Sequence, residues 1–224
     1  MRKFYILIVV LLILMQIFTA CAPKPIDNTE ELKEKDDKIE ELEREIKDLE
    51  AEIIKLSSTN NLVTQTMDVI LLIKRKDMKT LSQYVHPIKG IRFTPYFYVD
   101  TQQDKVFTAQ EVSGLMHDSQ VMRWGFYDGS GNPIDLTFSD YYDKFVYDKD
   151  FANPHVIGNN VAIGGGNTID NIREAYPEGY FLEFHFSQFD PQFSGIDWES
   201  LRLVFEKHDN TWYLVGIIHG QWTI

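Results

Sequence analysis

The chain of 224 residues has few of the residues on which several kinds of chemistry depend. Cys21 is its only cysteine, so the sequence excludes an internal disulfide and a cysteine-ligated metal centre. Lysine and arginine number 22 against 34 aspartates and glutamates, which gives a net charge of −12. Because nucleic-acid binding depends on clustered positive charge, we expect no nucleic-acid partner.

The one long apolar run stands at the N-terminus. Arg2 and Lys3 precede it, and Phe18-Thr19-Ala20-Cys21 follows it. A charged start, an apolar centre and small residues before a cleavage site predict a secretory signal peptide over residues 1–20. The Thr-Ala-Cys ending resembles the lipobox of bacterial lipoproteins, although Phe18 stands where leucine is usual. This resemblance implies a diacylated Cys21 that anchors the chain to the extracytoplasmic face of a cell membrane.

Residues 21–28 read as a short tether, and residues 29–61 as a coiled-coil stalk. Apolar residues recur there at alternating spacings of 3 and 4, and Ile at a with Leu at d favours a parallel pair of helices. We therefore expect a homodimer through residues 29–56. Like charges at Glu45 and Glu50 oppose that pairing, so a more basic partner helix stays open. Asn60 and Asn61 either continue the heptad or break the helix.

Residues 62–224 predict one α+β domain. Three strands near the C-terminus alternate clearly, and the last two form a hairpin. Thr-x-x-Glu at Thr108 is a capping box, and Pro95 should interrupt a strand. The expected helices cover 62–73, 77–85, 108–116, a segment that opens at Thr137 or Ser139 and ends near Val146, and 168–175. The expected strands cover 91–99, 121–127, 134–137, 156–163, 180–187, 201–207 and 212–219.

Two segments carry a resemblance to a fold family. The helical Asp-Met-Lys-Thr-Leu-Ser-Gln-Tyr-Val-His-Pro of residues 77–87 and the ending Trp-Tyr-Leu-Val-Gly-Ile-Ile-His of residues 212–219 resemble NTF2-like domains. The stretches 86–100, 124–152 and 197–224 look like an uncharacterised group of Gram-positive lipoproteins. The resemblance implies a curved antiparallel sheet packed on helices over residues 62–224. NTF2-like domains include enzymes, receptors and dimerisation modules, so it selects no activity.

Polar side chains on the C-terminal strands form the candidate ligand site. Strict alternation would bring Glu183, His185, Arg202 and His219 to one sheet face. There Arg202 could hold an anion and a His–Glu pair could move protons. The alternative is the ordinary solvated face of an antiparallel sheet.

Three other patterns resemble ligand sites, and each has a simpler interpretation. Gly164-Gly165-Gly166 could present backbone amides to an anion, but it lacks the spacing and lysine of a phosphate loop. Asp128-x-Ser130-x-Asn132 begins like a calcium loop but continues into Pro133, so we expect a turn. The six histidines show no ligand spacing, and we expect neither a metal nor another cofactor.

Aromatic residues concentrate over residues 93–98 and 124–127. They either belong to the core or line an exposed groove for a glycan or peptide. These observations favour a lipid-anchored, non-catalytic binding or interaction module with a wall or protein partner. The alternatives are a small-molecule or glycan receptor that uses the C-terminal sheet and an NTF2-like hydrolase or isomerase; no motif indicates an enzyme.

Overall fold

The computed structural model describes residues 29–223, without the side chains of residues 29–32 and 54–60. The predicted signal peptide, Cys21 and the tether lie outside these residues. Within them, no helix is both long and apolar enough to span a membrane. The chain divides into two compact units, Met1–Lys55 and Leu56–Ile224.

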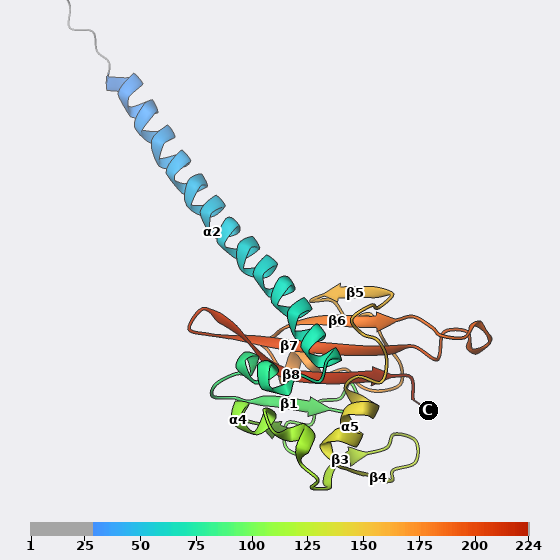
Figure 1. The fold of residues 1–224 in the computed structure, drawn as a ribbon. Coiled ribbons are helices and arrows are strands. Elements are labelled where there is room, and N and C mark those ends of the chain that lie inside the picture. The colour runs from blue at the N-terminus through green and yellow to red at the C-terminus, as the bar shows by residue number, and fades with distance from the viewer. Residues whose placement is uncertain (1–28, 224) are drawn as a thin grey trace, which may run out of the picture. The chain divides into compact units, whose positions relative to one another are not determined.

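One helix, α2, runs from Thr29 to Lys74 (Figure 1). This helix continues through Asn60 and Asn61, where a break was the alternative, and the coiled-coil stalk stays a prediction. In the first unit the apolar heptad positions remain uncovered, with exposed fractions of 43–62% at Ile39, Leu42, Ile46, Leu49 and Ile53. Whether a second helix covers them stays a prediction.

The second unit is a mixed α/β domain built on a curved sheet (Figure 1). Its strand order is β2-β1-β8-β7-β6-β5. The bounds are β1 Ile91–Thr94, β2 Lys105–Phe107, β5 Val156–Asn159, β6 Tyr180–Phe186, β7 Glu199–His208 and β8 Thr211–Gln221. A separate hairpin joins β3, Met122–Phe126, to β4, Pro133–Leu136.

The expectation of a fully antiparallel sheet is wrong at one position. Strand β1 lies parallel to β8, with Phe93 opposite Ile217. No hairpin connects these two strands, so turn geometry does not set their relative direction. The other ladders of this sheet are antiparallel.

Helices cover one face of this sheet and form the main core. The C-terminal part of α2 contributes Leu62, Val69, Ile70 and Ile73, and the sheet contributes residues such as Leu203. The short helices around this core are α3 Met78–Leu81, η1 Ser82–Tyr84, α4 Ala109–Val112, η2 Leu115–His117 and α5 Phe138–Phe145. Inside it, Trp124 stacks on Tyr141 with ring centroids 3.9 Å apart.

A second, smaller core covers the opposite face. Phe97, Ile172, Tyr176 and Trp198 pack there against residues such as Ile218. Helix α6, Ile172–Ala175, belongs to this layer, and the 3-10 turn η3 covers Pro191–Phe193. Both faces of the central strands are thus buried, so the prediction of a solvated sheet face is wrong.

Local signals gave correct helix starts at three places. Asp77 caps α3, Thr108 forms the predicted capping box of α4, and Thr137 caps α5. Strand β1 ends at Thr94, directly before Pro95. The helix expected from residue 168 begins only at Ile172, and Asn171 supplies no side-chain cap; its side-chain amide instead bonds the backbone of Val99.

Candidate functional site

An open groove of about 830 Å³ lies between the loop after β1 and the β3–β4 hairpin. Its aromatic walls are Tyr96, Tyr98, Phe126 and Tyr127. Its polar lining includes the carboxylates and amides of Asp100, Gln102, Gln103, Asp104, Asp128 and Asn167, the hydroxyl of Thr168, and the side chains of Arg123 and Lys105. The groove therefore combines flat apolar surfaces with hydrogen-bonding groups of both kinds.

The structure separates the aromatic residues into core and surface. Phe93, Phe97 and Trp124 are buried, as expected for core residues. Tyr98 and Phe126 are 51% and 50% exposed and line the groove. The Arg123 guanidinium lies 5.5 Å from the Phe126 ring centroid, and Asp135 pairs with Arg123. Some aromatic residues of these two segments thus belong to the core and others line a groove, and binding of a glycan or peptide there stays a prediction.

Asp104 lies at the base of the loop that lines the groove. Its carboxylate accepts hydrogen bonds from the Thr94 hydroxyl and the Asp100 N–H, both at 2.9 Å. Burial raises the pKa of Asp104 to about 6, although these hydrogen bonds oppose the rise. The groove thus contains a carboxyl group that titrates close to neutral pH.

A buried polar network occupies the other sheet face. The Glu183 carboxylate accepts from the N–H groups of Ile163 and Gly164 at 3.0 and 2.7 Å. It also accepts from the Ser200 hydroxyl at 2.7 Å and from Arg202 Nε at 2.9 Å. Glu183 and Arg202 are fully buried. The anion that the glycine-rich loop binds is therefore a carboxylate of this same chain.

Two nitrogens of the Arg202 guanidinium, Nε and Nη1, have carboxylate partners. Its Nη1 donates to Asp170 at 2.7 Å, and its guanidinium carbon lies 3.6 Å from the Phe97 ring centroid. These contacts connect the loop of residues 163–170 to the sheet. They give Arg202 a structural role. Its Nη2 has no hydrogen-bond partner but is buried, and the whole residue is closed off from solvent.

His185 and Ser200 complete this network. His185 Nδ1 lies 2.8 Å from the Ser200 oxygen. Because that hydroxyl donates its proton to Glu183, the hydrogen in this contact belongs to His185 Nδ1. Burial lowers the pKa of His185, against the opposing effect of Glu183. Burial therefore favours the neutral form of the ring.

The structure does not bring His219 to this network. Glu183 stands opposite Arg202, which stands opposite Ile218, so His219 points to the other face. The cause is a bulge in the β7–β8 ladder between Val204 and Phe205, which adds Val215 to β8. An extra residue reverses the side of every residue beyond it. The prediction that all four residues share one face is therefore wrong for His219.

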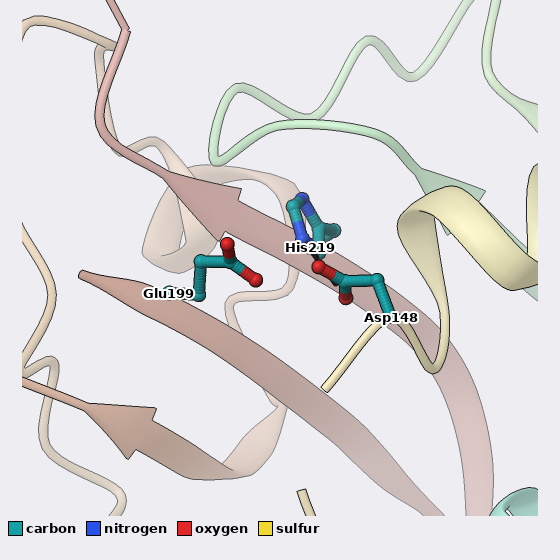
Figure 2. A group of neighbouring side chains, drawn as sticks. All are labelled: Asp148, Glu199 and His219. Atoms are coloured by element: carbon teal, nitrogen blue, oxygen red, sulfur yellow. Dashed lines mark ion pairs between the residues drawn. The ribbon is translucent and has the colours of Figure 1, made fainter. Parts of the chain in front are cut away.

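On its actual face His219 lies beside two residues that the sequence did not single out, Asp148 and Glu199 (Figure 2). The three stand far apart in the chain and share no local motif. Only the position of α5 over β7 and β8 brings them together. No spacing rule could have found them.

Comparison of the chain with protein-family models, with curated proteins and with solved structures finds no match.

Proposed function

We propose that this protein is a non-catalytic binding module, anchored through lipid on Cys21 to the extracytoplasmic face of a cell membrane. The coiled-coil part of α2 would act as its spacer and the domain of residues 56–224 as its receptor. The observation that carries the proposal is the open groove with Tyr98 and Phe126 half exposed on its walls. Exposed aromatic rings beside convergent polar groups are typical of a ligand site.

The chemistry of the groove favours a neutral polyhydroxylated ligand, such as a wall glycan. Aromatic side chains offer a flat apolar body that needs little ordering on binding. Asp100, Gln102 and Asp128 could bond hydroxyl groups along the same wall. A phosphorylated ligand fits poorly, because carboxylates outnumber the two basic side chains in the lining.

The proposal also includes an NTF2-like fold for the domain. Supporting it, helical residues of α2, α3 and α5 pack on one face of a curved sheet. The final hairpin also carries the Trp-x-x-x-Gly-Ile pattern from Trp212 to Ile217.

The C-terminal network offers little support for the alternative receptor site or for a hydrolase or isomerase. Glu183 already accepts four hydrogen bonds and has no free position for a substrate proton. His185 is 6% exposed and Arg202 is fully buried. We therefore place the ligand in the groove rather than on this face.

The test measures binding of soluble wall-glycan fragments to the full chain in detergent, by isothermal titration calorimetry. We expect Tyr98→Ala and Phe126→Ala each to weaken binding at least about tenfold, as loss of a stacking surface predicts. Phe193→Ala is the matched control, because Phe193 is 47% exposed and lies outside the groove. Absence of binding to the unmodified chain, or equal binding by all three variants, would overturn the proposal.

A further inference from the structure

Asp148, Glu199 and His219 come from three separate elements and meet at one point (Figure 2). Glu199 begins β7, His219 lies near the end of β8, and Asp148 follows α5. One potential ligand atom from each side chain lies within 4.8 Å of the other two. His219 is fully buried, and the side chains of Asp148 and Glu199 are 15% and 16% exposed.

The atoms that face this point have no hydrogen-bond partner. Asp148 Oδ1, Glu199 Oε2 and His219 Nε2 are buried and unpaired. Unpaired buried polar atoms are costly, and three around one point call for a common partner. The fully buried His219 ring, whose Nε2 has no hydrogen-bond partner, distinguishes this group from an ordinary acidic surface cluster.

The orientation of His219 is that of a metal ligand. Its Nδ1 lies 3.3 Å from the carbonyl oxygen of Pro95, and in the tautomer that donates to this oxygen Nε2 presents a lone pair. Metal-bound histidines generally donate their second N–H to such a backbone carbonyl. Nε2 lies 3.4 Å from Asp148 Oδ1. Two ligands about 2.1 Å from a tetrahedral ion stand about 3.4 Å apart.

Lys149 neutralises part of the negative charge but leaves the central point open. Its Nζ lies 2.9 Å from Glu199 Oε1 and 3.5 Å from Asp148 Oδ2. It therefore binds the two carboxylate oxygens that face away from the unpaired atoms. A cation between the Asp148 and Glu199 carboxylates would relieve the repulsion between their charges.

We propose that Asp148, Glu199 and His219 bind a divalent transition-metal ion, with Zn²⁺ as the best fit. One imidazole nitrogen and two carboxylate oxygens suit Zn²⁺ better than Mg²⁺ or Ca²⁺, which prefer all-oxygen sites. Three protein ligands leave a fourth position for water or another ligand. Glu199 and Lys149 also line a surface depression with Trp198 and Gln221, which gives the ion a path from solvent.

The site does not depend on the proposed groove, because the two share none of these three residues. Failure of glycan binding and failure of metal binding are therefore separate outcomes. The proposed metal site therefore does not depend on which ligand the groove binds.

The experiment titrates the full, metal-free chain in detergent with Zn²⁺ by isothermal titration calorimetry and repeats the titration with Mg²⁺. We expect one Zn²⁺ per chain, a rise in melting temperature with Zn²⁺, and no binding of Mg²⁺. Asp148→Asn and Glu199→Gln should each weaken Zn²⁺ binding at least about tenfold. Glu206→Gln is the control, since Glu206 is a buried carboxylate paired with Lys89 away from the site; its Zn²⁺ affinity should be unchanged.

Two results would overturn the proposal. One is the absence of stoichiometric Zn²⁺ binding to the unmodified chain. The other is Zn²⁺ binding that survives both Asp148→Asn and Glu199→Gln, which would place the ion on the acidic surface instead. Mg²⁺ bound as tightly as Zn²⁺ would contradict the assignment to a transition metal. If one variant fails to fold, the other and the unmodified chain still decide the matter.

Discussion

At the scale of single residues, Glu183 is the side chain on which the second face of the sheet most depends. Replacing it by glutamine removes the charge that faces Arg202 while preserving the volume. Breaking a buried pair on one side generally costs about 3–5 kcal/mol, because the remaining charge stays buried. Because Arg202 keeps its ion pair with Asp170, we expect Glu183→Gln to lower the free energy of unfolding in urea by the lower end of this range, about 3 kcal/mol.

The matched control is Asp135→Asn. Asp135 also pairs with an arginine, Arg123, but both side chains are about half exposed. Exposed pairs contribute about 0–1 kcal/mol, so this variant should remain close to the unmodified chain. Equal losses in the two variants would show that burial does not determine the contribution of the Glu183–Arg202 pair.

Asp104 gives a second prediction at this scale, in the pH dependence of stability. Its pKa in the folded chain is about 6, against an ordinary value of 3.8. The folded state therefore binds the proton more tightly, and this contribution to stability is present below about pH 4 and is lost as pH rises to 6. The Asp104→Asn variant has no carboxyl group at this position, so its stability does not fall through this ionisation. Between pH 4 and 6 the unfolding free energy of the unmodified chain should fall relative to the variant by at most about 2 kcal/mol.

The measurement is urea unfolding of both chains at several pH values between 4 and 8. Taking the difference between the two chains cancels the contributions of other titrating groups. Parallel curves would mean that Asp104 titrates normally in the folded chain. A difference of the opposite sign would mean that its hydrogen bonds from Thr94 and Asp100 outweigh its burial.

At the scale of elements, the sequence predicted best those features that are set by neighbouring residues. The capping box at Thr108 and the strand end before Pro95 depend on side chains within a few positions. The β3–β4 hairpin also follows from its turn residues. The late start of α6 has a different cause, because Asn171 bonds the backbone of Val99, which is distant in the sequence.

The failure at His219 has an equally specific cause. Counted from the turn with perfect pairing, His219 would stand opposite Ser200 and share its face. The bulge instead places it opposite Leu201. Nothing in the alternation of residues 211–221 indicates that Val215 is the extra residue. One such shift was enough to remove His219 from the predicted site and place it in a different cluster.

The stalk supplies the prediction that belongs to an element. Its a and d residues are about half exposed in the single chain, and burying them against a second helix would be favourable. Deleting residues 29–56 should therefore abolish a dimer and leave the domain folded. Sedimentation of the detergent-solubilised chain measures the first effect, and far-ultraviolet circular dichroism measures the second.

A subtler variant separates pairing from the mere presence of the segment. Ile46→Asn and Leu49→Asn together remove two apolar contacts while keeping the helix length, and should give a monomer. Glu40→Gln with Asp48→Asn changes exposed b and c positions away from the helix pair and should not. A dimer that persists without residues 29–56 would place the contact elsewhere in the molecule.

At the scale of the whole molecule, the sites depend on segments that only the complete fold brings together. The groove takes its aromatic residues from two segments about 30 positions apart, and the Asp148, Glu199 and His219 cluster takes its residues from three. Sequence reasoning identified the aromatic segments because they were locally dense. It could not identify the cluster, because each member alone is an ordinary acidic or histidine residue.

The anchor is the remaining feature at this scale, and Cys21→Ser tests it. The lipobox resemblance implies two acyl chains on Cys21, and two chains anchor a protein stably where one does so only marginally. In a bacterial host we expect mass spectrometry of the unmodified protein to find a diacylated Cys21 as the new N-terminus, in the membrane fraction. Cys21→Ser should lack the lipid mass, and Ala22→Ser is a control that keeps the cysteine. An unmodified Cys21 thiol in the membrane-bound protein would contradict the lipid anchor. Residues 1–20 would then have to hold the chain at the membrane, because they contain the one long apolar run of the sequence.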